Sequence, residues 1–237
     1  MDKPHGQVPK DLIIAIGREF GAGGRRVGRM LADHFGLAYY DKEMLSEAAS
    51  RMGYDHGIFA RYDEKRPSVM RSLISNAFGV QDAYLQNPMS SESIYMAQSR
   101  VIRELAAGGG CVFVGRTADY ILRESPHLVS IFLHAPLDFR AKVLLRRGEA
   151  SDINKARETA SKLDRNRRDF YNYYTDAEWG DAHTYHLTLN SSLLGAEGTF
   201  EVIKSYIGSK FSSSTPSQEQ PSGGATPPSG PPPGGKA

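Results

Sequence analysis

The sequence has almost no cysteine: Cys111 is the only one among 237 residues, which excludes an internal disulfide. It stands in the apolar run Cys-Val-Phe-Val, where a free thiol packs as a small hydrophobic side chain. So little cysteine is typical of a reducing compartment, where disulfides do not persist. We therefore expect Cys111 to be buried and the protein to be cytoplasmic.

Net charge and long apolar runs are lacking as well. The 29 Lys and Arg residues stand against 27 Asp and Glu, so the formal net charge is only +2. This balance gives no electrostatic argument for binding nucleic acid. No apolar run reaches the roughly 18 residues that a membrane-spanning helix needs, and the first residues lack the apolar core of a signal peptide. We expect small molecules as partners, neither nucleic acid nor a membrane; the oligomeric state stays open.

The two ends of the chain lack the residues that build a core. Residues 212–237 are almost entirely Ser, Pro, Gly, Thr, Gln and Ala, with no aromatic or branched aliphatic side chain. Such a segment cannot bury enough apolar surface to offset its chain entropy. We expect a flexible arm over residues 1–10, one domain over 11–208 and a disordered tail over 209–237.

Between these ends, apolar runs alternate with helical patterns. The runs predict strands at 12–16, 37–40, 111–114, 128–133 and 186–189. The patterns between them predict helices at 24–35, 117–123, 136–147, 151–172 and 196–208. Strands that alternate with helices predict an α/β fold with a parallel sheet covered on both faces.

Residues 42–109 are too long for a single crossover between two strands. Helical patterns at 44–52, 66–79 and 91–107 predict a helical insert after the second strand. Two interpretations stay open: the insert holds a second substrate beside the main domain, or it is an enlarged helical layer on the sheet.

The stretch from Leu12 to Val27 is the most informative, because an apolar strand pattern enters a glycine-rich turn and then a helical pattern. Glycine permits positive φ and a close approach of backbone N–H groups to phosphate oxygens. A helix that begins there adds the positive end of its dipole. We expect a phosphate-binding loop, and the alternative is a turn with solvated arginines. The glycines concerned are Gly17, Gly21, Gly23 and Gly24.

This loop departs from the usual P-loop pattern, G-x-x-x-x-G-K-[ST]. The spacing from Gly17 to Gly23 is one residue too long, the place of the lysine falls on Gly24, and no hydroxyl residue follows to hold Mg²⁺. Arg25 and Arg26 stand there instead, and both are candidates for binding phosphate. We expect Arg25 to replace the lysine, with one of the two neighbours facing the phosphates and the other turned away.

Further segments follow the loop in a definite order. They are Tyr40-Asp41 after the second strand, Val114-Gly115-Arg116 after the third, and Asp164-Arg-Asn-Arg-Arg-Asp169. The region 173–190 looks like a tyrosine-rich, W-G-D-containing signature of the cytidylate kinase-like family, with Asp176 and His186 in place of its Gly and Asp. Over about residues 12–208 the chain resembles that family, a branch of the P-loop nucleoside monophosphate kinases.

The resemblance implies a fold and a function for each of its segments. The sheet would have five parallel strands in the order 2-3-1-4-5, residues 42–109 would be the lobe that binds the nucleoside monophosphate, and about 148–182 would be a mobile lid. The lid pattern R-x-x-x-D-x-x-R maps onto Arg165, Asp169 and Asn172, with Arg168 between them. On the residues alone, these arginines could equally be a solvated helix end.

The resemblance also implies roles. Arg165 and Arg168 would stabilise the transferring phosphoryl group, while Asp41, Arg116 and Asp169 would bind the acceptor. The reaction would be ATP-dependent phosphorylation of a nucleoside monophosphate, a pyrimidine such as CMP or dCMP, with Mg²⁺ carried on the ATP and no metal site of the protein's own. Lys42 and Glu47 stand where the family has serine and arginine. The alternatives are a nucleotide-binding regulatory module with little catalysis and a kinase of another small molecule.

Overall fold

The computed structural model describes residues 8–53 and 91–212 of the chain. Its centre is a sheet of five parallel strands in the order β2-β3-β1-β4-β5, which confirms the predicted order. The strands are β1 (Ile13–Arg18), β2 (Ala38–Tyr40), β3 (Cys111–Val114), β4 (Leu128–His134) and β5 (Leu187–Asn190). Because β1 lies between β3 and β4, the loop that follows it emerges at the middle of one sheet edge.

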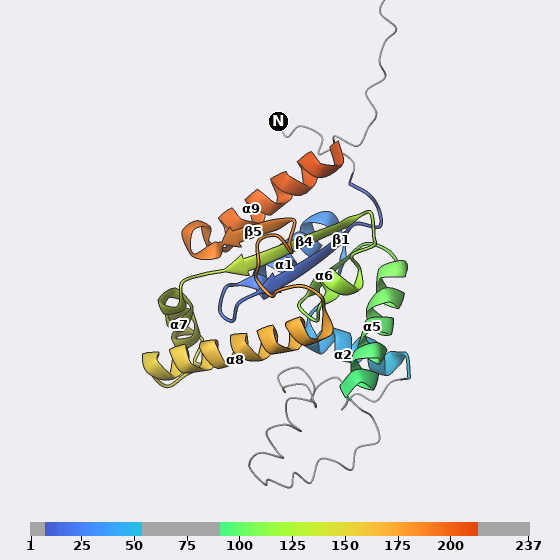
Figure 1. Cartoon of the computed structure of the whole chain (residues 1–237). Helices are drawn as coiled ribbons and strands as arrows, with labels where there is room; N and C mark the ends of the chain where they lie inside the picture. Colours follow the sequence, from blue (N-terminus) through green and yellow to red (C-terminus); the bar gives the residue numbers. More distant parts are fainter. Residues whose placement is uncertain (1–7, 54–90, 213–237) are drawn as a thin grey trace, which may run out of the picture.

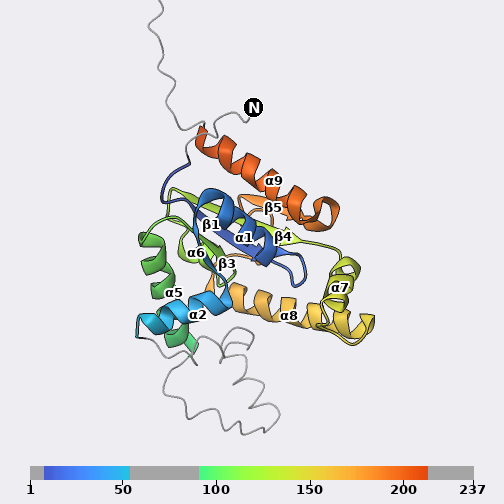
Figure 2. The same ribbon diagram turned by 180° about the vertical axis from the view of Figure 1, so that it is seen from behind.

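Helices cover both faces of the sheet (Figures 1 and 2). On one face lie α1 (Gly24–Phe35) and α9 (Ser191–Ser212), and on the other α2 (Lys42–Arg51), α5 (Ser91–Ala107) and the short α6 (Ala118–Ile121). Two further helices, α7 (Leu137–Arg146) and α8 (Ile153–Tyr174), pack on each other below the sheet in Figure 1.

The unbroken apolar run of β1 follows from this layered arrangement. Ile14 and Ile16 pack with α1 and α9, while Ile13 and Ala15 pack with α2, α5 and α6. Both sets are buried, so neither side of the strand tolerates a polar residue. Cys111 on β3 is buried too, as predicted, and burial raises the pKa of its thiol to about 12.

Packing contacts extend slightly beyond both predicted ends of the domain. Val8 packs against the core, and the carbonyl of Lys10 accepts a hydrogen bond from the N–H of Gly110, so residues 8–10 are not a loose arm. At the other end α9 continues to Ser212, because Phe211 packs against the same core and Lys210 donates to the carbonyl of Leu128. The rest of the predicted arm and tail lies outside the described residues.

The region predicted as a helical insert begins with α2 and ends with α5, which contact each other. The helix predicted at 66–79 lies outside the described residues. Across residues 8–53 and 91–212, none of the helices is long and apolar enough to cross a membrane.

Candidate functional site

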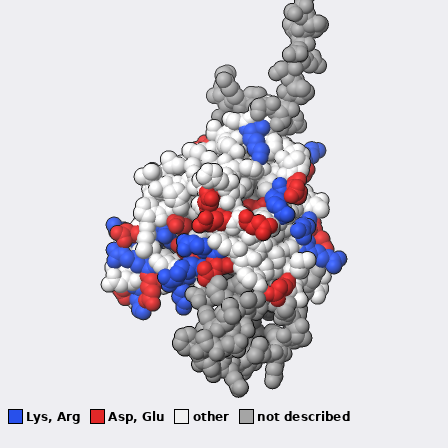
Figure 3. Space-filling view, in the orientation of Figure 1, with Lys and Arg blue, Asp and Glu red and all other residues white. Residues whose placement is uncertain are grey.

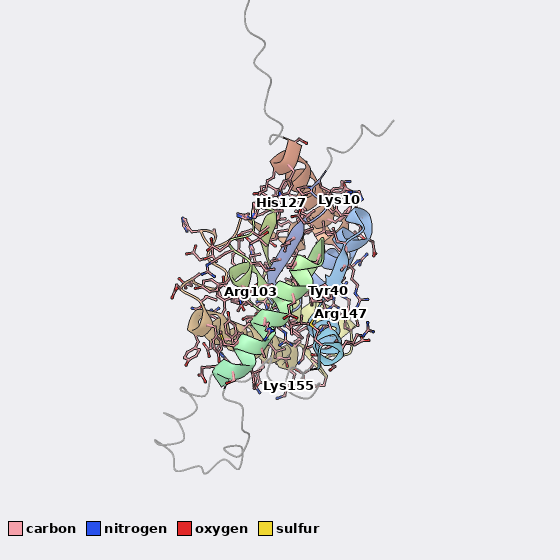
Figure 4. The ribbon with its side chains drawn as sticks, turned by 90° about the vertical axis from the view of Figure 1, so that its right-hand side faces the viewer. Lys10, Tyr40, Arg103, His127, Arg147 and Lys155 are labelled. Carbon is pink, nitrogen blue, oxygen red and sulfur yellow. The ribbon has the colours of Figure 1, made fainter. Side chains whose placement is uncertain are left out.

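The carboxyl ends of the strands meet at one edge of the sheet, where ligands gather in open α/β folds. Figure 4 separates the two edges: Lys10 and His127, which precede β1 and β4, lie toward the top, whereas Tyr40 and Arg147 lie farther down. Tyr40 ends β2 and Arg147 follows α7. The glycine-rich loop follows β1 at this lower edge.

The backbone of this loop has the conformation that a phosphate cradle needs. The φ angles of Gly21 and Gly23 are 86° and 87°, a region that favours glycine. Gly23 is the N-cap of α1, and its carbonyl accepts the N–H groups of Arg26 and Val27. The first N–H groups of α1 therefore open toward the space over the loop.

A buried ion pair between α7 and α8 fixes the first half of the loop. Asp164 accepts the backbone N–H of Phe20 at 2.7 Å and Nη1 of Arg140 at 2.6 Å. Arg140 also donates to the carbonyls of Phe20 and Ala135 and lies 3.2 Å from the carboxylate of Glu19. The loop, one residue longer than usual, is thus tied to α8. The tie is made by Asp164, within the segment that the resemblance implies as a lid.

The two arginines predicted to bind phosphate are engaged with carboxylates. Arg25 donates to both oxygens of Glu43 at 2.8 Å and lies 3.8 Å from Asp41. Arg26 pairs with Glu197 at the start of α9. Both side chains are more than half exposed, so these pairs are weak in water. As expected of neighbours on a helix, the two point in different directions.

One cavity lies between the loop, α7 and the start of α9, and we refer to it as the loop–α7 cavity. Its walls combine apolar groups of Val27, Phe139 and Val143 with backbone of Gly21 and Gly23. Arginines stand at its rim: Arg26, Arg146 and Arg147. An apolar slot beside a phosphate cradle, with cations at the rim, suits a flat aromatic base that carries a polyphosphate.

A second cavity, the β1–β3 cavity, lies on the other side of the loop. Arg18, Arg116 and Arg167 line it from three different elements. Its aromatic wall consists of Phe170, Tyr171, Trp179 and Tyr185. Several guanidinium groups in one concave site repel each other, and an anion bound between them would relieve that repulsion.

The turn after β3 presents Arg116 to this cavity. Gly115, Arg116 and Thr117 all have positive φ, at 80°, 64° and 53°. Two successive non-glycine residues in this region cost roughly 1–2 kcal/mol each, a strain that is typical of functional sites. Arg116 is held by Gln98 of α5, whose side-chain oxygen accepts from Nη1 at 2.9 Å.

The arginines of α8 are arranged differently from the prediction. Arg165 to Arg168 lie within α8, as in the helix predicted at 151–172, and not at its end. Arg165 and Arg168 are exposed, and Arg168 lies 5.8 Å from the ring centre of Trp179. Arg167, which was not predicted, faces the β1–β3 cavity and donates to the carbonyl of Arg18 at 3.4 Å.

The lid pattern itself contains the signal that identifies Arg167. Its D-x-x-R half is matched by Asp164 and Arg167, which lie three apart on one face of α8. The first arginine of the pattern then falls on Ala160, which is fully buried. Asp169, predicted to bind the acceptor, is not among the residues that line the β1–β3 cavity.

Asp41 begins α2 rather than standing free in the site. Its carboxylate accepts the N–H of Met44, the N-cap contact that starts a helix, and it is buried. Burial alone would raise the pKa of Asp41, but the hydrogen bond from Met44 and the charge of Arg25 hold it below its ordinary value. Asp41 is therefore ionised at neutral pH and attracts cations or donors of a ligand.

The β1–β3 cavity also contains one buried carboxyl group that sequence reasoning passed over. Asp119 of α6 accepts a hydrogen bond from the hydroxyl group of Tyr171 at 2.7 Å. Burial raises the pKa of Asp119, although the bond from Tyr171 opposes the rise. This contact ties α6 to α8 across the cavity.

Charges of both signs intermix on the face shown in Figure 3, over α7 and α8 in particular. No broad patch of one sign is visible among the described residues of this face. The positive charge of the β1–β3 cavity is therefore a local feature, suited to a small anion.

Known proteins similar to the chain were found at the level of family, sequence and structure. The model of the cytidylate kinase-like family matches residues 13–193. A cytidylate kinase of Methanopyrus kandleri is 24% identical over 83% of the chain and 93% of its own length. One of Pyrococcus horikoshii is 25% identical over 84% and 91%. A crystal structure of an uncharacterized protein of Eubacterium ventriosum superposes with a TM-score of 0.62 at 27% identity, over 83% of the chain and 98% of its own.

Proposed function

The chain belongs to the cytidylate kinase-like family, and on that basis we propose that it transfers the γ-phosphoryl group of ATP to a nucleoside monophosphate, with CMP or dCMP preferred. The observation that carries this proposal is the pair of cavities on the two sides of one glycine-rich loop. A donor and an acceptor must meet end to end at a phosphate cradle for in-line transfer.

ATP would occupy the loop–α7 cavity. Its base would lie against Val27 and Phe139, and its polyphosphate would contact Arg146 at the end of α7 and Arg147 directly after it. The backbone N–H groups of Gly21, Gly23 and Gly24 would surround the β-phosphate. Mg²⁺ would arrive with the ATP and neutralise phosphate charge. It would be held largely through water, because the loop offers no hydroxyl ligand.

The acceptor would place its phosphate in the β1–β3 cavity. Arg116 and Arg167 would hold that phosphate through charge-assisted hydrogen bonds. An oxygen of the acceptor phosphate attacks the γ-phosphorus, and the bond from the γ-phosphorus to the β–γ bridging oxygen breaks. The products are ADP and a nucleoside diphosphate. Arg167 would thus bind the acceptor phosphate together with Arg116, whereas Arg165 and Arg168 do not line this cavity.

A coupled assay of CMP, dCMP, UMP, AMP and GMP with MgATP tests the proposal. We expect ADP formation with at least one pyrimidine nucleotide and slower turnover with AMP and GMP. Turnover with a purine alone would refute the pyrimidine preference. No turnover with any of the five would refute the assignment as a nucleoside monophosphate kinase.

One observation favours a second candidate, a nucleotide-binding module without useful catalysis. Arg25 and Arg26, the loop's own cations, are paired with Glu43 and Glu197. Calorimetric titration of MgATP, followed by product analysis after several hours, separates the two candidates. Saturable binding without product supports the module, whereas product at ordinary enzymatic rates excludes it.

A further inference from the structure

A phosphate loop without a lysine needs another source of positive charge at the β- and γ-phosphates. Gly24 stands in the lysine's place, and the two arginines that follow it are paired with carboxylates. The question of which side chain supplies the charge rests on the proposed function, because it presumes that the loop binds a nucleotide.

The side chain of Arg18 follows a path that passes the empty lysine position. A Cβ atom built on Gly24 would lie 2.9 Å from Cγ and 3.1 Å from Cβ of Arg18. One built on Gly115 would lie only 1.7 Å from Nη1 of Arg18. The stem of Arg18 therefore packs on the first residue of α1, and its guanidinium lies against the turn after β3.

The backbone conformation at position 24 does not require glycine. Its φ angle is not positive, unlike those of Gly21 and Gly23, so any residue could adopt the conformation. What excludes a side chain there is the stem of Arg18. A lysine at position 24 and an arginine at position 18 thus compete for the same space.

Arg18 lines the β1–β3 cavity, close to the turn after β3. Its carbonyl accepts a hydrogen bond from Arg167, and Arg116 shares the β1–β3 cavity with it. Arg18 is the last residue of β1, next to Gly17 of the loop, whereas Arg116 lies in the turn after β3 and Arg167 lies in α8. Arg18 is therefore the cavity arginine nearest along the chain to the phosphate cradle.

We propose that Arg18 supplies the positive charge that lysine supplies in the usual loop, reaching the β- and γ-phosphates of ATP from the end of β1. The glycine at position 24 is the structural consequence, because it makes room for the stem of Arg18. The planar guanidinium can contact two phosphate oxygens at once, which a lysine ammonium does not do with fixed geometry.

Calorimetric titration of MgATP and of MgADP into a set of variants tests this inference. Arg18→Gln keeps the stem and removes the charge, and it should weaken MgATP binding about tenfold or more. Arg51→Ala, an exposed arginine of α2 paired with Glu47, is the matched control for the loss of one cation and should leave affinity unchanged. MgATP should lose more affinity than MgADP on Arg18→Gln, because the γ-phosphate is the group most in need of the charge.

The decisive variant moves the charge back to the lysine position. Gly24→Lys alone should weaken MgATP binding, because the new side chain collides with Arg18. The double variant Arg18→Ala with Gly24→Lys should bind MgATP at least fivefold more tightly than Arg18→Ala alone. Melting temperatures without ligand identify any variant that fails to fold, and in that case the comparison of Arg18→Gln with Arg51→Ala decides the question.

Binding of MgATP requires no knowledge of the acceptor, so this inference and the proposed function fail in different ways. Unchanged MgATP affinity in Arg18→Gln refutes the role of Arg18 even if the enzyme turns over CMP. Loss of affinity in Arg18→Gln, together with rescue of Arg18→Ala by Gly24→Lys, supports that role even if none of the five acceptors is phosphorylated.

Discussion

The buried pair of Arg140 and Asp164 should be the most sensitive polar contact of the fold. Their side chains are 7% and 8% exposed, and Asp164 bonds both to Arg140 and to the backbone N–H of Phe20. Asp164→Ala removes both bonds at once. It leaves a buried guanidinium whose remaining carboxylate partner is Glu19, 3.2 Å away.

The expected loss of unfolding free energy follows from these contacts. Breaking one side of a buried pair costs about 3–5 kcal/mol, and the remaining contact with Glu19 favours the lower end. A loss of about 3 kcal/mol is a large part of the roughly 5–15 kcal/mol that stabilises a typical domain. With a urea m-value of about 1.5–3 kcal/mol/M, the midpoint should fall by about 1–2 M.

Urea unfolding followed by circular dichroism measures this effect in Asp164→Ala and in the double variant Asp164→Leu with Arg140→Met. The double variant should be more stable than Asp164→Leu alone, because it also removes the buried guanidinium that Asp164→Leu leaves without this partner. A loss below about 1 kcal/mol in Asp164→Ala would contradict the reasoning. So would a double variant no more stable than Asp164→Leu.

Three further results are expected. Gly21→Ala should lower both stability and MgATP affinity, because the φ angle of Gly21 is 86° and the new Cβ would lie 3.1 Å from Cβ of Arg140. The control Gly208→Ala, in open space on α9, should lower neither. Equal melting temperatures of the two variants would contradict this expectation. His186 accepts the N–H of Ser130 on Nδ1, and burial together with Lys210 lowers its pKa. On acidification, His186 of the unfolded chain therefore takes up a proton before His186 of the folded protein does. The contribution of neutral His186 to the unfolding free energy is complete above about pH 6.5 and is lost as the pH falls toward the folded pKa. The stability difference between wild type and His186→Asn should shrink over that interval, and a constant difference would count against the contact. Trp179 is the only tryptophan of the chain and lines the β1–β3 cavity, so the acceptor nucleotide should change its fluorescence; no change at concentrations that support turnover would exclude binding there.

Local patterns were sufficient for most of the fold. The helix predicted at 24–35 has the observed bounds of α1, because glycines set its start and Gly36 its end. The apolar run of β1 predicted a strand buried on both faces, since its alternate residues contact opposite helical layers. The φ angles of Gly21 and Gly23 follow from the turn that must join β1 to α1.

Those patterns do not predict contacts between residues that are far apart in the sequence. Arg140 and Asp164 are 24 residues apart, and nothing in either local sequence marks them as partners. The orientation of Arg25 depends on Glu43, which is brought near by the crossover through β2. The D-x-x-R spacing of Asp164 and Arg167 marks this arginine in the sequence, but its place in the β1–β3 cavity depends on the rotation of α8 relative to the sheet, which Asp164 sets through its bond to Phe20.

The proposed function requires donor and acceptor to occupy different cavities on the two sides of one loop. Steady-state kinetics of Arg147→Ala and Arg116→Ala, with both nucleotides varied, test it most directly. We expect Arg147→Ala to raise KM for ATP several-fold with little effect on KM for the acceptor, and Arg116→Ala to do the reverse. If both variants raise KM for the same substrate, or if Arg116→Ala raises only KM for ATP, the two substrates do not bind in separate cavities in this way.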